Sequence, residues 1–263
     1  MGGIEDRLSN IRTNIRKVKK RADLPLPANN ETVQIVCYGP SLKYTWQEID
    51  LNKSVVTVSA AHDFLRERRI TPNAHVEFDW RPHKAKHVNN PGDTVFYLAS
   101  CVHPDLIAKV DPILWHAQQT AKENKYIFRR EPGSFLVPGG SSAGLRAIEL
   151  MYALGFRKFD IFGMDSSFEE SEWAGPHHGK SRDKREIIVF PLAGRKFKTS
   201  IAFLVYADQF KSCKAVLKDA SFTLHGDGLI QAMNTKERPY DIPRPDHGSK
   251  TTGSRSTPAV RIS

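Results

Sequence analysis

The chain has 263 residues, enough for one large α/β domain or two small ones, each with a proper core. Its 40% hydrophobic and 26% charged residues are ordinary for a soluble globular protein, and no apolar run approaches the ~20 residues that span a bilayer. The N-terminus lacks the apolar centre of a signal peptide, so we expect a cytoplasmic protein. Three widely spaced cysteines without a CxxC motif indicate neither a disulfide framework nor a zinc site.

The net charge of +10 is concentrated at the two ends of the chain. Residues 1–23 hold seven basic and three acidic residues, a net charge of +4, and residues 236–263 hold six and three, a net charge of +3. Such ends can attract nucleic acid or another acidic surface. Solvated termini that favour solubility are the simpler alternative.

The first helix is predicted from its apolar spacing. Within residues 4–21, apolar side chains recur at alternating spacings of four and three, at Ile4, Leu8, Ile11, Ile15 and Val18. This pattern predicts a helix with one narrow apolar stripe. Each such side chain gains roughly 1.5–3 kcal/mol on burial, so the stripe must be covered. The helix therefore docks on its own domain or on a second chain, and the strict spacing favours a homodimer.

From residue 33 onward, short apolar runs alternate with amphipathic stretches. The runs predict strands at residues 33–39, 54–60, 74–78, 94–100, 112–117, 158–165 and 187–191. Helices are expected at residues 62–69, 104–110, 142–156 and 200–212, and a last strand-turn-helix unit lies before residue 234. Strands that are apolar on both faces and alternate with helices imply a parallel sheet covered on both sides. We therefore predict an α/β fold with an open, doubly wound, mostly parallel Rossmann-like sheet.

Composition divides the chain into three parts. Residues 1–30 form the basic amphipathic helix and a linker rich in Pro and Asn, and residues 31–235 form the Rossmann-like domain. Residues 236–263 contain many polar and charged residues and almost nothing to bury, so we expect a disordered basic tail.

Ligands of such sheets bind beyond the carboxyl ends of the strands, where Gly39-Pro40-Ser41 follows the first strand. Gly39 lets the backbone approach a ligand without a Cβ in the way. Ser41 could cap a following helix and offer N–H groups to a phosphate. An ordinary strand-ending turn needs the same residues and is the alternative.

A second candidate anion site precedes the helix at residues 142–156. Gly139, Gly140, Ser141 and Ser142 form a glycine-rich approach with a serine cap, which offers free N–H groups and the positive end of the helix dipole. No Gly-Lys-Ser/Thr closes the loop, so it is not a Walker loop. A well-capped structural helix is the alternative.

We expect a nucleotide between these two segments. The substitution Gly39→Val is then predicted to abolish nucleotide binding and to leave the fold intact.

Two carboxylates and two histidines complete the candidate site. Asp79 follows the third strand and could hold Mg²⁺, or it could simply pair with Arg81. Asp165 follows a later strand, and if both carboxylates reach one cleft they could hold a metal or a ribose. His177 and His178 lie in a polar loop as candidate general bases, unless they are only surface residues.

Several segments together resemble a known family. "CYGPSL" near the start, "RITPNAHVEFDWRP" in the middle and "GSSAGLRAIELMYALGFRKFDIFGMDSSF" further on are similar to the 6-hydroxymethylpterin diphosphokinase MptE-like proteins. The resemblance covers roughly residues 33–168 and extends toward residue 233 through "LHGDGLIQAM". It implies a Mg²⁺-dependent transfer of diphosphate from ATP to a hydroxymethyl acceptor, with Asp79 as the candidate metal ligand.

That family resembles in turn a group of bacterial sialyltransferases with a similar Gly-Pro-Ser turn. There the turn and a serine-rich helix start contact a cytidine nucleotide, and a histidine beyond a late strand acts as base. This resemblance implies corresponding roles for Gly39, Pro40, Ser41, Ser141, Ser142 and one of His177 or His178. The alternative function is therefore a glycosyltransferase that uses a nucleotide-activated sugar and a small-molecule or glycan acceptor. A third hypothesis is a non-enzymatic protein that binds nucleic acid through its basic ends.

Overall fold

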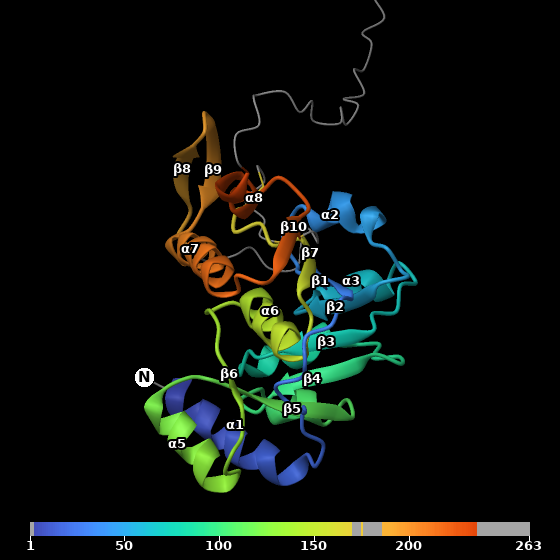
Figure 1. Ribbon diagram of the computed structural model, residues 1–263, viewed down its shortest axis with the longest axis vertical. Helices are drawn as coiled ribbons and strands as arrows, with labels where there is room; N and C mark the ends of the chain where they lie inside the picture. The colour runs from blue at the N-terminus through green and yellow to red at the C-terminus, as the bar shows by residue number, and fades with distance from the viewer. Residues whose placement is uncertain (1–2, 170–174, 176–185, 236–263) are drawn as a thin grey trace, which may run out of the picture.

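The computed structural model describes residues 3–169, 175 and 186–235. These residues form one large sheet with helices packed around it and a separate two-stranded hairpin (Figure 1). The elements in chain order are α1 (Gly3–Lys17), β1 (Thr32–Val36), α2 (Leu42–Thr45), η1 (Trp46–Glu48), β2 (Ser54–Val58), α3 (Ala61–Arg66), β3 (Ala74–Glu77), η2 (Pro82–His87), β4 (Val95–Ala99), α4 (Pro104–Ile107), β5 (Pro112–Ala117), α5 (Ala121–Arg130), β6 (Leu136–Val137), α6 (Ala143–Ala153), β7 (Lys158–Phe162), β8 (Ile188–Leu192), β9 (Arg195–Thr199), α7 (Ile201–Val216), β10 (Ser221–Leu224) and α8 (Leu229–Asn234).

The large sheet has eight strands in the order β10-β7-β1-β2-β3-β4-β5-β6. All of its strand pairs are parallel. The chain adds strands from β1 to β6 in one direction and then returns to place β7 on the other side of β1. The order therefore reverses between β1 and β7, which is the topological switch point of a doubly wound sheet. The predicted fold class is confirmed.

Both faces of the sheet are buried, as the strand pattern requires. In β1, Val36 packs into one cluster with Phe64 and Leu65 of α3, whereas its neighbour Ile35 packs into the other cluster with helix α6 residues such as Ile148. Successive side chains of a strand point to opposite faces, so an apolar run is buried only if helices cover both sides.

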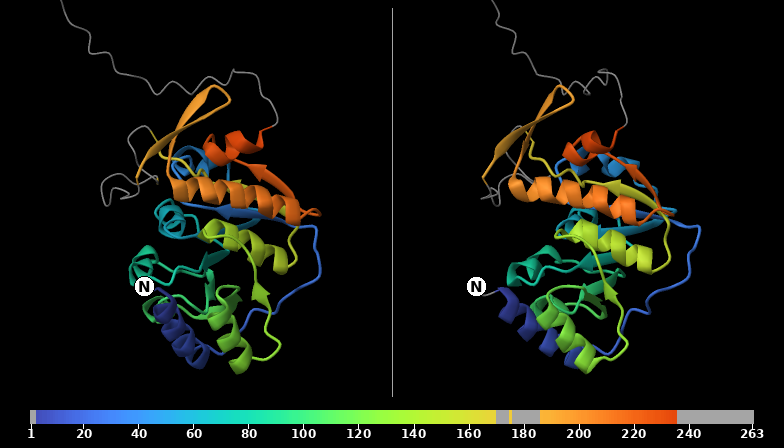
Figure 2. Two further views of the ribbon diagram at one scale, coloured as in Figure 1. Left: turned by 90° about the vertical axis from the view of Figure 1, so that its left-hand side faces the viewer. Right: turned by 60° about the vertical axis from the view of Figure 1, so that its left-hand side comes forward.

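Helix α1 docks on its own chain. Leu8, Ile11 and Val18 of the predicted stripe are at most 7% exposed, and the helix packs against α4 and α5. The buried amide of Asn14 donates to the carbonyls of Ser100 and Val102, at 3.0 and 2.8 Å. Figure 2 shows α1 and α5 side by side at the end of the molecule opposite the β8-β9 hairpin. Docking on the same chain, one of the two predicted alternatives, therefore covers most of the stripe, whereas Ile4 is 40% exposed. A homodimer remains a prediction.

The elements that were not expected from the sequence include α5, β6 and β9. Helix α5 begins with a capping box in which the side chains of Thr120 and Glu123 satisfy each other's backbone N–H groups. Strand β6 has only two residues, too few for a periodic signal. Strand β9 is rich in basic residues and pairs with β8 across a tight turn in which Ala193 and Gly194 have φ of 48° and 71°. No described helix combines the length and apolar character that a bilayer crossing requires.

Candidate functional site

The Gly39-Pro40-Ser41 turn lies against the end of β7 at the switch point. The backbone N–H of Gly39 donates to the carbonyl oxygen of Gly163 at 2.7 Å. A Cβ on Gly39 would lie 2.4 Å from that oxygen and 2.5 Å from Oδ2 of Asp165. Gly39 is therefore required by the close approach of two chain segments. The prediction that Gly39→Val leaves the fold intact is wrong on this geometry.

Asp165 anchors the turn from the neighbouring strand. Its side chain is buried, with the residue only 3% exposed. Its Oδ2 accepts the backbone N–H of Ser41 at 2.7 Å, and its Oδ1 accepts the Ser41 hydroxyl at 2.6 Å. The Ser41 N–H is thus already paired, and the hydroxyl makes no capping bond to α2. The expectation that Ser41 caps a helix and offers its own N–H to a phosphate is corrected accordingly.

A third turn, after β10, closes on the same pair. A Cβ on Gly226 would lie 2.4 Å from Oγ of Ser41, and one on Gly228 would lie 2.5 Å from Cβ of Asp165. The backbone N–H of Ile230 donates to the Asp165 carbonyl at 3.1 Å. The turns that follow β1, β7 and β10 therefore meet around one buried carboxylate.

The neighbouring His225 completes this edge of the sheet. Its ring stacks on Phe162 with the centroids 3.9 Å apart, and its Nδ1 lies 2.9 Å from a carboxylate oxygen of Glu48. The His225 side chain is 22% exposed and that of Glu48 is 56% exposed, so this pair forms the solvent-facing side of the cluster.

Burial raises the pKa of Asp165 to about 6, although its two bonds from Ser41 act in the opposite direction. An unfolded aspartate titrates near 4, so the folded chain binds this proton more tightly than the unfolded chain. The free energy of unfolding that this group contributes is therefore fully present below pH ~4 and is lost as the pH rises through about 6.

The variant Asp165→Asn isolates this titration, because the amide keeps the size of the side chain and can bond to Ser41 without ionising. We expect the stability of the wild type relative to this variant to fall by about 2 kcal/mol between pH ~4 and ~7. Denaturant unfolding of both proteins at a series of pH values measures the difference. Carboxylates with lowered pKa, such as Glu131 at about 2, cancel in this comparison. A difference that stays flat with pH would mean that Asp165 does not titrate in this range.

The start of α6 lies at the same edge of the sheet as the Gly39 turn. Gly144, in its first turn, packs so closely that a Cβ would lie 2.7 Å from Sγ of Cys37 and 2.4 Å from Cε of Met164. Cys37 lies two residues before Gly39, and Met164 directly precedes Asp165. The structure thus brings together the two segments between which a nucleotide was predicted.

The helix start itself is largely occupied by protein groups. Ser142 caps α6 by accepting the N–H of Leu145 at 3.3 Å, as the sequence predicted. The N–H of Ser141 donates to the side-chain oxygen of Gln209 on α7 at 2.8 Å. A Cβ on Gly140 would lie 2.7 Å from that same oxygen. The sequence predicts free backbone N–H groups here for an anion, but the Ser141 N–H already donates to a protein oxygen.

A buried arginine fixes this loop from inside. Arg146 is 8% exposed and donates to the carbonyls of Gly140, Val137 and Gln118 at 2.9 to 3.0 Å. Its guanidinium also lies over the Phe78 ring, 5.2 Å from the centroid. Arg146 therefore ties the helix start to the ends of β5 and β6.

Asp79 belongs to a separate charged cluster beyond β3. Both of its carboxylate oxygens accept bonds from Arg81, and the ammonium of Lys84 lies 3.7 Å away. The pKa of Asp79 is lowered: burial opposes the shift, and the Arg81 bond and the Lys84 charge drive it. Lys84 also reaches the Ser59 hydroxyl at 3.1 Å and the buried Glu77 at 3.8 Å. Two cations already neutralise the Asp79 carboxylate, which makes it a poor ligand for a resident Mg²⁺.

Asp79 and Asp165 do not share one cleft. They follow β3 and β7, which are separated by β1 and β2, so three strand spacings of ~4.8 Å place the two strands roughly 14 Å apart. A single cation with ligands at ~2 Å cannot bridge them. Among the described residues, no group of three or more His, Cys, Asp or Glu side chains could hold a metal ion. The strand order therefore speaks against one metal ion held by both carboxylates.

His177 and His178 lie outside the described residues. Gly175, which is described, lies beside the residue that precedes the Gly39 turn, because a Cβ there would lie 2.8 Å from the Tyr38 ring. The chain therefore passes the turn two residues before His177.

Several residues of these clusters were missed by sequence reasoning, among them Glu48, Glu77, Lys84, Arg146 and Gln209. Glu77 carried a usable signal, because it is a carboxylate in a strand that is otherwise suited to complete burial. Its Oε1 accepts the N–H groups of Phe78 and Asp79 at 2.9 and 3.0 Å, which shapes the turn after β3. The partners of Arg146 and Gln209 are distant in sequence and left no local signal.

Comparison with known proteins supports this assignment of fold and family. Residues 6–171 match the family described as 6-hydroxymethylpterin diphosphokinase MptE-like, and the chain therefore belongs to that family. The match begins within α1, so it includes the N-terminal helix.

Among solved structures, the chain is similar to the MAf glycosyltransferase from Magnetospirillum magneticum AMB-1, with a TM-score of 0.68 and 15% sequence identity. The alignment covers 86% of this chain and 37% of that one, so this chain spans little more than a third of the larger protein. At this identity the likeness shows the fold. No curated protein matches the chain.

Proposed function

We propose that the protein is a nucleotide-dependent transferase whose site lies beyond the carboxyl ends of β1 and β7. The observation that carries this proposal is the meeting of the Gly39-Pro40-Ser41 turn, Asp165 and the start of α6 at the topological switch point. Open α/β sheets bind their ligands at this position, because the loops on either side diverge there. The family to which the chain belongs is named after a transferase of the same kind.

In the first form of the proposal, the protein transfers diphosphate from ATP to a hydroxymethyl acceptor. The acceptor oxygen attacks the β-phosphorus of ATP, the bond from that phosphorus to the α-phosphate oxygen breaks, and AMP leaves. The acceptor hydroxyl must lose a proton, for which His177 or His178 is the candidate base. Lys84 and Arg81 are the described cations at the strand ends that could face phosphate oxygens. Mg²⁺ would neutralise phosphate charge and is expected to enter with the nucleotide.

The second form is a glycosyltransferase that uses a nucleotide-activated sugar. The observation that favours it is the structural likeness to a glycosyltransferase over 86% of the chain, since the family match ends at residue 171. An alignment over 86% of the chain is longer than the family match and so includes residues beyond residue 171. In this form the leaving group is a nucleotide phosphate, and an acceptor hydroxyl again needs a base.

Thermal unfolding with ATP, CMP, UDP and GTP, each with and without Mg²⁺, separates the two forms. We expect ATP with Mg²⁺ to raise the melting temperature if diphosphate is transferred. Stabilisation by CMP or UDP without a metal would favour sugar transfer. If no nucleotide stabilises the protein at millimolar concentration, the proposal of a nucleotide-dependent transferase is wrong.

Hydrogen exchange with the stabilising nucleotide tests the position of the site. We expect slower exchange in residues 38–42, 139–145 and 163–168, which meet at the switch point. Protection confined to other segments would contradict this position and leave the choice of nucleotide unaffected.

The role of Asp79 is tested in the same thermal experiment. If Asp79 holds Mg²⁺, Asp79→Asn removes the part of the stabilisation by ATP that depends on the metal, and Arg81→Gln enhances it by freeing the carboxylate. If Asp79 serves only its ion pairs with Arg81 and Lys84, both variants keep the response to Mg²⁺ unchanged. The surrounding cations lead us to expect the second result.

A further inference from the structure

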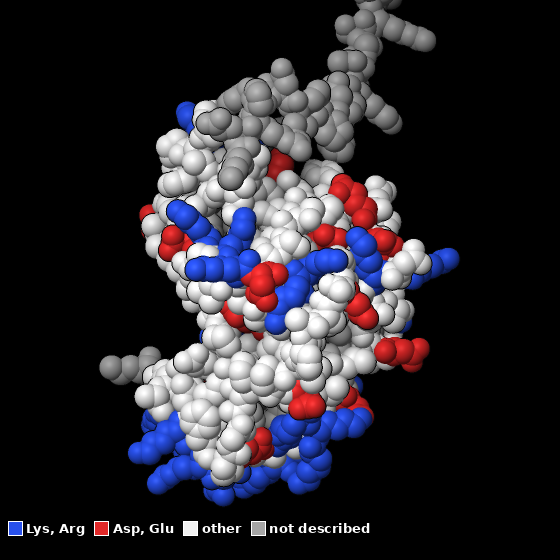
Figure 3. All heavy atoms as spheres, in the orientation of Figure 1, with Lys and Arg blue, Asp and Glu red and all other residues white. Residues whose placement is uncertain are grey.

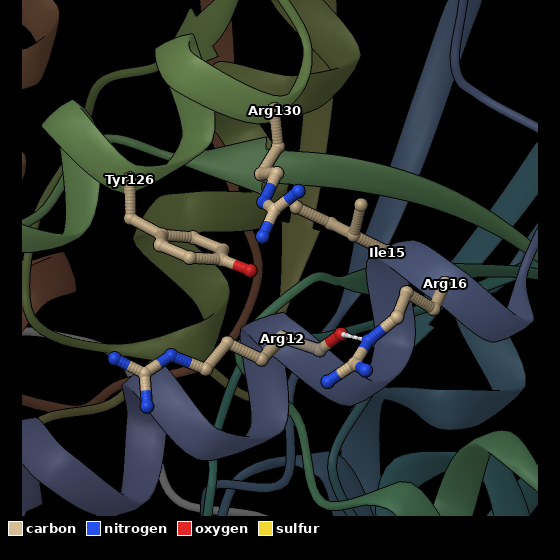
Figure 4. Close-up of a pocket in the computed structure, with 5 residues that line it drawn as sticks. All are labelled: Arg12, Ile15, Arg16, Tyr126 and Arg130. Carbon is tan, nitrogen blue, oxygen red and sulfur yellow. Dashed lines mark hydrogen bonds between the residues drawn. The ribbon is translucent and has the colours of Figure 1, made fainter.

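A hollow of about 480 Å³ lies between α1 and α5, away from the switch point. Its lining residues are Arg12, Ile15, Arg16, Tyr126 and Arg130 (Figure 4). Tyr126 and Arg130 reach from α5 toward the α1 side chains, so the two helices form the two walls. The space is lined by three guanidinium groups, one aromatic ring and one aliphatic side chain.

The three guanidinium groups carry uncompensated charge. Among the described residues, none of them forms an ion pair with a carboxylate, although other basic residues of these helices do. Arg7 pairs with the buried Glu123, and Lys122 pairs with Glu5. Glu5 is the acidic residue that Arg12 influences, and it is already held by that lysine. Three unpaired arginines around one hollow create a positive potential that favours an anion.

The charge continues around the hollow. Figure 3 shows Lys and Arg side chains crowded over the end of the molecule formed by α1 and α5. The exposed basic residues of these two helices are Arg12, Arg16, Lys17, Lys122, Lys125, Arg129 and Arg130. An anion that extends beyond the hollow would therefore meet further cations.

The aromatic ring narrows the choice of anion. Tyr126 is half-buried, with the guanidinium groups of Arg12 and Arg130 lying 5.5 and 5.7 Å from its ring centroid. Proteins that bind single-stranded nucleic acid combine such rings with arginines, because a base stacks on the ring while cations contact the phosphates. A bilayer surface is too flat to enter the hollow. In a duplex the bases are stacked on one another within the double helix, so they cannot reach the Tyr126 ring. An acidic peptide would use the arginines and leave the ring without a role.

We propose that the hollow between α1 and α5 binds single-stranded nucleic acid. The arginines contact phosphate oxygens, and a base packs against Tyr126 and the neighbouring Ile15. This surface lies at the opposite side of β5 from the proposed transferase site and does not depend on that site's function.

The test is fluorescence anisotropy of a short fluorescein-labelled oligothymidylate with the full chain. We expect the logarithm of the association constant to fall linearly with the logarithm of the salt concentration. The steepness of this line should decrease by about 0.7 for each phosphate contact that a variant removes. Arg12→Gln, Arg16→Gln and Arg130→Gln should each show this loss. Tyr126→Leu keeps an apolar wall and should weaken binding at least about fivefold through lost stacking.

Arg129→Gln is the matched control, because Arg129 is exposed on the same helix and does not line the hollow. It should weaken binding clearly less than Arg130→Gln does, because Arg129 offers only a surface contact outside the hollow. If Arg129→Gln and Arg130→Gln lose the same affinity for the oligonucleotide, the nucleic acid is attracted by the whole basic surface and the proposed site is wrong. An unchanged affinity in Tyr126→Leu, tighter binding to duplex, to polyglutamate or to phosphatidylglycerol vesicles, or no binding at all would also overturn the proposal.

Discussion

Replacing Gly39 by alanine is expected to destabilise the protein by about 3 kcal/mol or more. The added Cβ would lie 2.4 Å from the Gly163 carbonyl oxygen and 2.5 Å from the Asp165 carboxylate. Neither neighbour can move freely. The Gly163 carbonyl belongs to the backbone and accepts a hydrogen bond from Gly39, and the buried Asp165 carboxylate accepts two hydrogen bonds from Ser41. Overpacking with no room to relax lies at the upper end of single-residue effects. Valine would be worse, because two further methyl groups enter the same space.

Denaturant unfolding of Gly39→Ala and of a matched glycine variant provides the measurement. Gly3→Ala is the control, because a Cβ there would meet Trp80 at an ordinary 3.4 Å and alanine favours a helix. We expect the control to be neutral or slightly stabilising. If Gly39→Ala loses less than about 1 kcal/mol, the two chain segments are not held as closely as the structure shows.

Replacing Arg146 by methionine is expected to cost about 3 kcal/mol. Methionine fills a similar volume but loses three hydrogen bonds from a charged donor to the carbonyls of Gly140, Val137 and Gln118. A hydrogen bond from a charged donor contributes more to the free energy of unfolding than a bond between neutral groups. In the variant the three carbonyls also lose their buried hydrogen-bond donor. The pKa of Arg146 is lowered by burial, so removal of the charge offsets part of the loss.

Arg129→Met makes the same chemical change on the exposed surface of α5 and should stay within about 0.5 kcal/mol of the wild type. Arg146→Lys should recover only part of the stability, because one ammonium cannot reach three separated carbonyls. Equal stability of the two methionine variants would show that the Arg146 bonds contribute nothing net. The Arg146 variant should also bind nucleotide more weakly, because the loop at Gly140 loses its support.

The elements of the fold could be predicted because their signals are local. The run from Val33 to Val36 is apolar except for Gln34, which marks a strand buried on both faces, and β1 has that burial. The stripe from Leu8 to Val18 likewise marked a helix that needs cover. Where the local signal was short or polar, as in β6 and β9, prediction failed. The capping box at Thr120 was a local signal for α5 that the apolar pattern did not use.

The candidate site could be predicted only in part. Strand ends marked Gly39, Ser41 and Asp165 as residues of interest, since parallel strands present their carboxyl ends at one edge. Whether they contact a nucleotide stays a prediction. The pairing of Ser41 with Asp165 joins residues 124 positions apart, and the sequence near either residue is the same whether or not they meet. The same reasoning grouped Asp79 with Asp165, which the strand order separates.

The sequence by itself determined which segments become strands and helices and which faces they bury, because those properties depend on residue spacings within one element. Only the tertiary structure decided what each face and each strand end would contact. The strand order places β7 beside β1 and keeps β3 away, which gives Asp165 the Ser41 turn and leaves Asp79 to Arg81 and Lys84. The same packing covers the α1 stripe with α4 and α5 and brings Arg12 beside Tyr126. These contacts join residues far apart in the chain, so their energies depend on an arrangement that no single stretch of sequence encodes.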